Sequence, residues 1–154
     1  MIVFMSDYLK FRSALQKFSR QFDGNGSIKT PCGENISPAK AHAIMEIGKR
    51  KKLSLSQKDL TESLSLNKSN ITRLVQSLEK SNFLKRVVSS SDKRLILLEL
   101  TPKGVQLCKR LEISSSKYIE ELLGHIPTNK HKKLIETLEE LNRATTLIKE
   151  KRGS

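Results

Sequence analysis

The chain has 154 residues, 36% of them hydrophobic, and a formal net charge of +13, which suits one compact domain over residues 1–154. No segment approaches the ~20 consecutive apolar residues that cross a bilayer, and the apolar run before Asp7 is too short for a secretory signal. Cys32 and Cys108 lie far apart and match neither a metal-binding nor a redox spacing. We therefore expect reduced thiols in a cytoplasmic protein without a cofactor.

The positive charge is concentrated in the middle of the chain. Residues 49–94 hold 12 basic and 4 acidic side chains, a net +8 of the total +13. Such a local excess is typical of a surface that binds a polyanion. Charge by itself does not separate nucleic acid from an anionic membrane or an acidic protein, so the pattern within the segment has to decide.

Residues 7–22 carry apolar side chains at spacings of mostly three and four, which predicts an amphipathic helix. The next segment, "DGNGSIKTPCGENISP", contains three glycines and two prolines and is typical of a linker. Its glycines do not predict a phosphate-binding loop, because no strand precedes them and no Gly-Lys-Ser/Thr follows. The apolar positions of the helix are Leu9, Phe11, Leu15, Phe18 and Phe22.

A second helix is predicted to begin at Ser37-Pro38, a cap followed by a first-turn proline, and to end at Gly48. The basic run "KRKK" follows, either along a phosphate backbone or as a solvated turn. The alternation in "LSLS" is compatible with a short strand. The apolar stripe expected on this helix is Ala39, Ala43, Ile44 and Ile47.

Two short helices then flank a tight turn. Ser56, with Asp59 three residues later, resembles a capping box with aspartate in place of glutamate, and it opens the helix "QKDLTESL". The letters "SLN" form the turn, and Asn67 caps the helix "KSNITRLVQSLEK". The first two turns of this helix are polar, whereas its inward face is expected to carry Ile71, Leu74, Val75 and Leu78.

After this helix the hydrophobic pattern changes from a helical to a strand-like period. The runs "FLKRVV" and "RLILLELT" are joined by the polar "SSSDK", which predicts a β-hairpin with a basic tip. Within the second run, Ile96, Leu98 and Leu100 would share one face.

Two long helices complete the chain. Thr101-Pro102 caps the first of them, and a break at "GHIP" separates it from the last. The predicted fold class is mainly α with a small β-hairpin wing (α+β): a winged helix-turn-helix core over 37–102, flanked by N- and C-terminal dimerisation helices at 7–22 and 103–150. A small winged core cannot cover the apolar stripes of three further helices, whereas a second chain can. A monomer that packs these helices intramolecularly is the alternative.

In a winged helix-turn-helix, the second helix enters the major groove with its N-terminal residues against the base edges. Small side chains there allow close approach, and asparagine and arginine pair bidentately with adenine and guanine. A polar helix start alone is weak evidence, because solvated helices begin in the same way. Together with the preceding capped helix, the basic hairpin tip and the local charge, it predicts a DNA-binding surface.

The run "SQKDLTESLSLNKSNITRLVQSLEKSNFLKRVVSSSDKRLILLELTPKG" resembles the core of the MarR family of bacterial transcriptional regulators. The matching features are a "D-L-x-x-x-L" helix, "N-K-S-x-[IV]-T-R-L-V-x-x-L-E-K" for recognition, and "D-x-R" ahead of "L-x-L-T-x-x-G" for the wing. The resemblance covers residues 37–112, and the flanking helices match by position only.

This resemblance implies a homodimer that binds a pseudo-palindromic double-stranded operator, acts as a repressor, and is tuned by a small ligand or an oxidant at residues that the sequence does not identify. It also implies that Asp92 braces the wing and that Arg94 enters the minor groove, where narrowing deepens the negative potential. The DNA-binding residues that we expect are Lys68, Ser69, Asn70, Thr72, Arg73, Gln76, Lys93 and Arg94.

Two features depart from the family pattern. Ser65 stands where many members have glycine in the turn between the helices, which predicts a strained backbone or a different turn. The "KRKKLSLS" connection is a residue or two longer than usual. Both features limit how closely phosphate contacts can be assigned.

Other chemistry has weaker support. His42, Cys108 and Glu112 are zinc-type ligands, but the histidine-rich cluster of zinc-sensing relatives is missing, so we expect no metal site and predict that His42 lies in the core or lines a pocket. Cys32 would sense peroxide only if nearby cations such as Lys29 lowered its pKa. No catalytic triad, paired acids or nucleotide loop is visible, so we do not expect an enzyme.

Two rival functions remain open from the sequence. The first is a winged-helix module that binds protein and has no operator. The second is electrostatic association with an anionic membrane, which we do not expect. Substitution of the basic residues in the recognition helix and the wing separates DNA binding from the first rival, and competition between duplex and vesicles separates it from the second.

Overall fold

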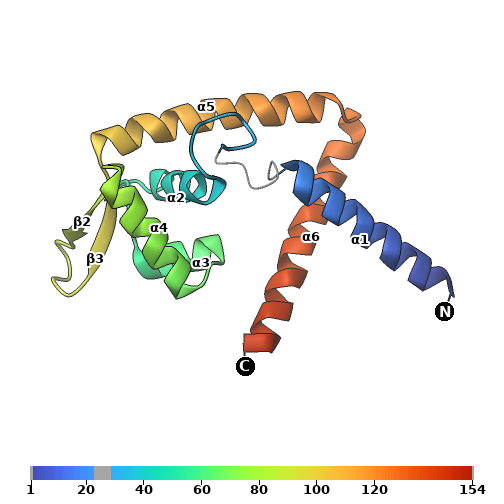
Figure 1. The fold of residues 1–154 in the computed structure, drawn as a ribbon, viewed down its shortest axis with the longest axis horizontal. Coiled ribbons are helices and arrows are strands. Elements are labelled where there is room, and N and C mark those ends of the chain that lie inside the picture. Colours follow the sequence, from blue (N-terminus) through green and yellow to red (C-terminus); the bar gives the residue numbers. More distant parts are fainter. Residues whose placement is uncertain (1, 23–28, 154) are drawn as a thin grey trace. The chain divides into compact units, whose positions relative to one another are not determined.

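A computed structural model describes residues 2–22 and 29–153 of the chain. It divides into two compact units, Met1–Ser115 and Ser116–Ser154. The second unit holds the end of α5 and all of α6 (Thr128–Gly153). The first contains α1 (Ile2–Phe22), α2 (Pro38–Gly48), β1 (Ser54–Ser56), α3 (Gln57–Leu64), α4 (Lys68–Lys80), β2 (Leu84–Val88), β3 (Ile96–Leu100) and the start of α5 (Pro102–Gly124) (Figure 1). The predicted fold class, mainly α with a small β wing, is confirmed.

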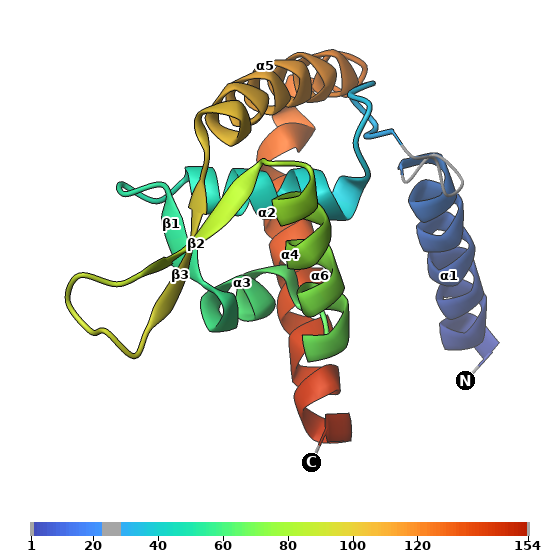
Figure 2. The ribbon, with the colours of Figure 1, turned by 60° about the vertical axis from the view of Figure 1, so that its left-hand side comes forward.

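The sheet has three antiparallel strands in the order β1-β3-β2. Leu55 of β1 is opposite Leu98 of β3, and β2 pairs with β3 along its whole length. The sequence predicted the hairpin and a short strand in "LSLS", but it did not predict that they join in one sheet. Because β1 leads directly into α3, this pairing attaches the base of the wing to the helix-turn-helix (Figure 2).

The core of the first unit is formed by α2, α3, α4, the sheet and the start of α5. The inward face predicted for α4 is correct, since all four of its apolar side chains are buried. Full burial of one such side chain contributes roughly 1.5–3 kcal/mol. The largest fully buried side chains include Ile44, Ile47, Leu60, Ile71, Leu78, Leu84, Leu98 and Leu111.

Two details of α2 differ from the prediction. Ala39 is exposed and Ala41 is buried in its place, because Ala39 lies in the first turn at the edge of the packed face. Ser37 occupies the cap position of α2, but its side chain makes no cap hydrogen bond. On β3, Leu98 and Leu100 are buried, whereas Ile96, the first residue of the strand, is 50% exposed.

The start of α5 is held tightly against the winged core. A Cβ added to Gly48 would overlap the Sγ of Cys108, and one added to Gly104 would overlap the carbonyl oxygen of Phe83. Thr101 caps the helix as predicted: its hydroxyl accepts a hydrogen bond from the Gly104 N–H at 3.1 Å. These close approaches require glycine at both positions.

The flanking helices are longer than the sequence predicted. The first begins at Ile2, not at residue 7, because nothing in residues 2–6 breaks a helix, and the last extends to Gly153. No helix in the described parts of the chain is long and apolar enough to cross a membrane.

In the second unit, α6 folds back after the predicted break at "GHIP". The His131 ring closes this turn. Its Nε2 atom lies 3.0 Å from the carbonyl oxygen of Leu123 and 2.8 Å from that of Ile126. Both oxygens can only accept, so Nε2 carries a proton. The ring thereby bonds the Ile126 carbonyl and adds a second partner to the Leu123 carbonyl, which also accepts from the Ile126 N–H.

Candidate nucleic-acid interface

The first helix of the helix-turn-helix begins at the predicted capping motif. The Ser56 hydroxyl accepts a hydrogen bond from the Asp59 N–H at 3.1 Å and donates to the Asp59 Oδ2 at 2.7 Å. In the usual capping box the acid bonds the backbone of the cap residue; here it bonds the cap side chain. The effect is the same, because the two residues together fix where α3 starts.

The turn between α3 and α4 has the strained backbone that the sequence predicted. Ser65 adopts the left-handed conformation, with φ 51° and ψ 30°, and its N–H donates to the Glu62 carbonyl. For a residue with a Cβ this conformation costs about 1–2 kcal/mol. Asn67 then caps α4, and its side-chain oxygen accepts from the Asn70 N–H at 2.8 Å.

The two faces of α4 differ sharply. Its buried face packs on the core. Its outer face is polar along the whole helix. In the described parts of the chain, the side chains of Ser69, Arg73 and Gln76 make no hydrogen bond or ion pair. Five of the six predicted DNA-binding residues of α4 are exposed, namely Lys68, Ser69, Asn70, Arg73 and Gln76.

Thr72 is the exception among these residues. It is half-buried, and its hydroxyl donates to the Lys68 carbonyl at 2.9 Å and accepts from the Gln57 Nε2 at 3.3 Å. Its hydrogen-bonding capacity is therefore largely used within the protein.

The wing is a short, well-bonded loop that ends in exposed cations. Asp92 accepts hydrogen bonds from the backbone N–H of Arg94 at 2.9 Å and from its Nε at 3.3 Å. The Leu95 N–H donates to the Asp92 carbonyl, and the Ser89 N–H donates to the Leu95 carbonyl. The Arg94 side chain is 93% exposed, and Lys93 is exposed beside it.

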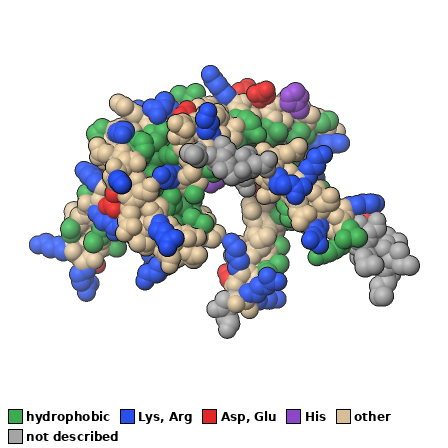
Figure 3. All heavy atoms as spheres, viewed as in Figure 1, with side chains coloured by type: hydrophobic (Ala, Val, Ile, Leu, Met, Phe, Trp, Pro, Cys, Tyr) green, Lys and Arg blue, Asp and Glu red, His purple; other side chains and the backbone are tan. Residues whose placement is uncertain are grey.

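The N-terminal end of α4 and the tip of the wing lie on the same side of the first unit (Figure 1). Figure 3 shows blue, basic side chains over both of these places. Two of the four acids in residues 49–94, Glu79 and Asp92, are paired with arginines, and the segment carries a net charge of +8. A surface of this shape and sign fits a nucleic-acid duplex.

Sequence reasoning missed Arg86 and its partner Gln57, which lie next to this surface. Arg86 of β2 donates from Nε to the Glu79 Oε1 at 3.0 Å and from Nη1 to the Gln57 Oε1 at 3.4 Å. The strand period could have indicated it, because Arg86 shares a face with Leu84, which is buried. The Arg86 side chain is still 38% exposed, and it reaches polar partners on α3 and α4.

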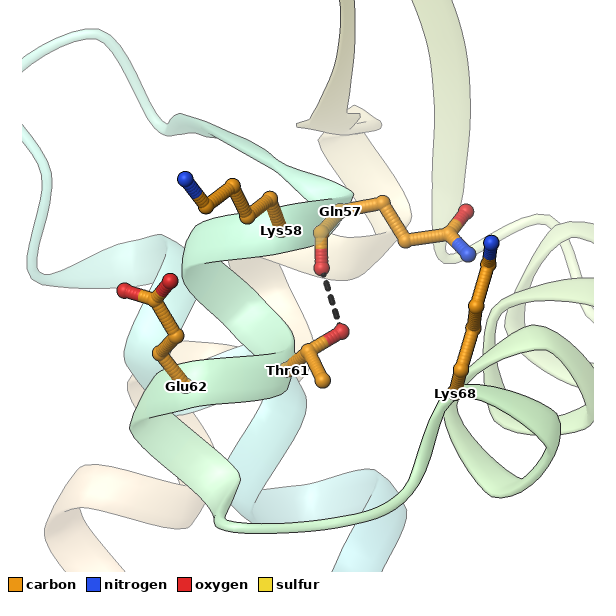
Figure 4. Close-up of a pocket in the computed structure, with 5 residues that line it drawn as sticks. All are labelled: Gln57, Lys58, Thr61, Glu62 and Lys68. Carbon is orange, nitrogen blue, oxygen red and sulfur yellow. Dashed lines mark hydrogen bonds between the residues drawn. The ribbon is translucent and has the colours of Figure 1, made fainter. Parts of the chain in front are cut away.

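A shallow pocket separates α3 from the start of α4 (Figure 4). The Thr61 hydroxyl donates to the Gln57 carbonyl at 2.7 Å on one wall of this pocket. The Gln57 side chain points from α3 towards α4. The pocket is lined by Gln57, Lys58, Thr61, Glu62 and Lys68.

The structure also places the residues considered for other chemistry. His42 is exposed, not in the core, and lines a groove with Met45, Glu46, Lys49, Ser63 and Leu64, as the pocket alternative predicted. Cys108 lies 3.8 Å from the Glu112 Oε1. Within the described residues, no three His, Cys, Asp or Glu side chains are grouped to hold a metal.

The two thiols lie in different surroundings. Burial raises the pKa of the Cys108 thiol, and the neighbouring Glu112 charge raises it further. Cys32 is half-buried and lies 3.1 Å from the Thr30 hydroxyl. A raised pKa keeps the Cys108 thiol protonated and unreactive at neutral pH.

Comparison with known proteins agrees with this geometry. HTH-type transcriptional regulator PrsX of Escherichia coli is 32% identical over 84 residues, which cover 54% of this chain and 50% of PrsX. Exopolysaccharide II synthesis transcriptional activator ExpG of Rhizobium meliloti (strain 1021) is 29% identical over 120 residues, which cover 77% of this chain and 60% of ExpG. The chain thus spans about half the length of PrsX and somewhat more of ExpG.

The fold has counterparts among solved structures. FabT of Streptococcus pneumoniae, crystallised in complex with DNA, superposes with a TM-score of 0.76 over 92% of this chain and 99% of FabT. Its sequence identity is 18%, so this likeness concerns the fold alone. In addition, the sequence of residues 34–95 matches the model of the MarR family. Over these residues, and in its winged helix-turn-helix fold, the chain is similar to the MarR family.

Proposed function

We propose that the chain is a sequence-specific regulator of transcription that binds double-stranded DNA through α4 and the β2–β3 wing. The observation that carries this proposal is the division of α4 into a buried apolar face and a polar face with free side chains such as Arg73. A helix held rigidly from one side and unpartnered on the other suits insertion into a groove. The match of residues 34–95 to the MarR family supports the same function.

The side chains on α4 suit direct contact with base edges. Asn70 and Arg73 lie almost one helical turn apart on the exposed face. An asparagine amide can bond adenine through N6 and N7, and an arginine can bond guanine through O6 and N7. Lys68 and Ser69, at the positive N-terminal end of α4, are placed to contact phosphate oxygens.

The wing would contribute a second contact. Arg94 is almost fully exposed at the end of the hairpin, and Lys93 adjoins it. An arginine in a narrow minor groove gains from the enhanced negative potential there. With α4 in the major groove, the wing would reach the neighbouring minor groove of the same duplex.

We also propose a homodimer. Many large apolar side chains of the flanking helices are at least one-third exposed in the single chain, which is typical of an interaction surface. Two-fold pairing through these helices would set the two copies of α4 ~34–36 Å apart, one turn of duplex. These side chains are Tyr8, Leu9, Phe11, Leu15 and Phe18 on α1, Ile113 and Ile119 on α5, and Ile135, Leu138, Leu147 and Ile148 on α6.

In this proposal the dimer represses by occupying an operator. A small ligand or an oxidant would favour a dimer conformation whose α4 helices no longer match the half-site spacing, and so shift the population away from DNA. ExpG is named an activator, so the direction of regulation needs its own measurement. A reporter behind the bound site should rise in expression when the regulator is removed.

The test of the DNA-binding proposal is selection of bound duplexes from a random library with the purified chain. We expect inverted half-sites with centres about one helical turn apart. Sedimentation of the free protein should give the mass of two chains. Recovery of no motif would contradict sequence-specific binding and favour a protein-interaction module.

A further inference from the structure

Two apolar residues of the wing are exposed beside its cationic tip. Val88, the last residue of β2, is 63% exposed, and Ile96, the first residue of β3, is 50% exposed. The two residues are directly opposite each other in the hairpin, so their Cβ atoms lie about 4.5–5.5 Å apart on one face of the sheet. They form one apolar patch, which is called the stem patch below.

The stem patch lies on the face of the sheet that packs against the helices. Side chains alternate between the two faces along a strand, so Val88 shares its face with Arg86, and Ile96 shares the same face with Leu98. Leu98 is buried in the core. Arg86 reaches side chains of both α3 and α4. The stem patch is therefore turned towards the side on which α3 and α4 lie, one alternation nearer to the tip.

This position is the one that a backbone strand of bound DNA would cross. A helix in the major groove and a wing in the neighbouring minor groove straddle one strand of the duplex, which has to pass over the sheet face between them. Cations lie on both sides of the stem patch along the hairpin: Arg86 towards α4, and Lys93 and Arg94 at the tip. A DNA backbone likewise alternates anionic phosphates with deoxyribose rings, whose C–H groups are apolar.

We propose that Val88 and Ile96 pack against deoxyribose of the backbone strand that separates the two grooves. This inference rests on the DNA-binding function proposed above, and it adds a contact that reads no base and forms no ion pair. Covering the stem patch with a sugar removes apolar surface from water. The contribution of this contact is therefore independent of salt, whereas that of the neighbouring cations depends on it.

The experiment replaces each residue of the stem patch with threonine. Threonine is β-branched and favours strands as valine and isoleucine do, so Val88→Thr and Ile96→Thr should fold, as chemical denaturation can verify. Binding of the selected duplex is then measured at several salt concentrations. We expect each variant to bind about two- to tenfold more weakly than the wild type, because less apolar surface is buried. The factor should be the same at every salt concentration.

The salt dependence separates a direct contact from a structural role. A wing that was displaced by the substitution would also lose the charge contacts of Lys93 and Arg94, so the salt slope would fall. Val87→Thr is the matched control, since Val87 adjoins Val88 on β2 but lies on the opposite face. It should bind like the wild type. A lowered slope in the stem-patch variants, or equal weakening in Val87→Thr, would overturn the inference.

Single ribonucleotides in the duplex test the sugar itself. Ribose differs from deoxyribose by the 2′-OH, a polar group on the minor-groove side. At the sugar that faces the stem patch, a ribonucleotide should weaken the wild type severalfold. It should weaken Val88→Thr less, because the threonine hydroxyl can bond the 2′-OH. A duplex position with this difference supports the contact, and equal effects on both proteins at every position would contradict it.

The remaining outcomes concern other occupants of the stem patch. Unchanged affinity in both Val88→Thr and Ile96→Thr would overturn the inference and leave DNA binding intact. If these variants instead sediment with a lower mass than the wild type, the stem patch joins two copies of the chain, and the sugar contact is wrong. A wild type that binds no duplex would overturn the proposed function itself.

Discussion

Asp92 holds Arg94 by two hydrogen bonds, one from the backbone N–H at 2.9 Å and one from Nε at 3.3 Å, while the arginine side chain remains 93% exposed. An exposed ion pair of this kind contributes only about 0–1 kcal/mol to stability. Asp92 therefore shapes the loop and directs the guanidinium more than it stabilises the fold. Both Nη groups of Arg94 stay available for DNA.

Replacement of Asp92 should show which of its two hydrogen bonds matters. Asp92→Asn and Asp92→Ala remove the same charge, but only asparagine keeps an acceptor for the Arg94 N–H. We expect DNA affinity to be weaker in the alanine variant by about 1 kcal/mol, the contribution of one hydrogen bond. Equal dissociation constants at one salt concentration would show that the turn does not position the wing.

Arg73 and Lys51 should affect DNA binding in different ways. Arg73→Ala should cost roughly 1–3 kcal/mol and relax the base preference at one position. Lys51→Ala should weaken all sequences alike and lower the salt slope by about one, as expected for a phosphate contact. Binding titrations at several salt concentrations distinguish the two.

The exposed Lys109 of α5 is the matched control for these two variants. The substitution Lys109→Ala removes the same charge from a position outside α4 and the wing. It should therefore leave both the base preference and the salt slope unchanged. If Arg73→Ala and Lys51→Ala also bind like the wild type, the partner of this surface is not DNA.

Ser65→Gly should not destabilise the protein. Glycine adopts the left-handed conformation at φ 51° without a Cβ penalty, which saves about 1–2 kcal/mol. The added flexibility of the unfolded chain opposes this by about 0.4–1 kcal/mol. The net expectation is a gain of between 0 and about 1.6 kcal/mol in the free energy of unfolding, measured by chemical denaturation.

Ser77→Gly is the control for this substitution. Ser77 lies within α4, where glycine destabilises by roughly 0.5 kcal/mol relative to serine because the helical conformation costs it more entropy. Opposite signs for the two variants are expected. A loss of stability in both would show that the turn at Ser65 has no conformational strain to relieve.

Cys108 should resist alkylation and make the stability depend on pH. Burial raises the pKa of its thiol in the folded state, so on raising the pH the unfolded chain ionises first, near pH ~8.5. The stabilisation is complete below that pH and is lost as the pH rises towards the folded pKa. Iodoacetamide should modify Cys32 before Cys108, as peptide mapping can show.

Cys108→Ala should flatten the fall in the free energy of unfolding that begins above about pH 8.5. Cys32→Ala leaves the buried Cys108 in place, so this variant should keep the fall. An equal slope in the wild type and in Cys108→Ala would mean that the thiol ionises alike in the folded and unfolded chain.

Local chemistry was sufficient to predict most of the elements. Caps such as Ser56 and Asn67 bond residues three positions away, and the buried face of α4 repeats within single turns. These interactions act over a few residues, so they can be recognised in the sequence before the chain is folded. The left-handed backbone at Ser65 was one of two alternatives offered by the resemblance to the MarR family, in which many members have glycine there.

Only the tertiary structure determined which contacts the elements make with one another. The pairing of β1 with β3 and the contact of Gln57 with Arg86, 29 residues apart, depend on how whole elements pack. For the same reason the periodicity of α2 did not show that Ala41 would be buried in place of Ala39, or that His42 would be exposed. Helical spacing sets the direction of each side chain around the helix axis. The neighbouring elements determine which side of the helix is covered.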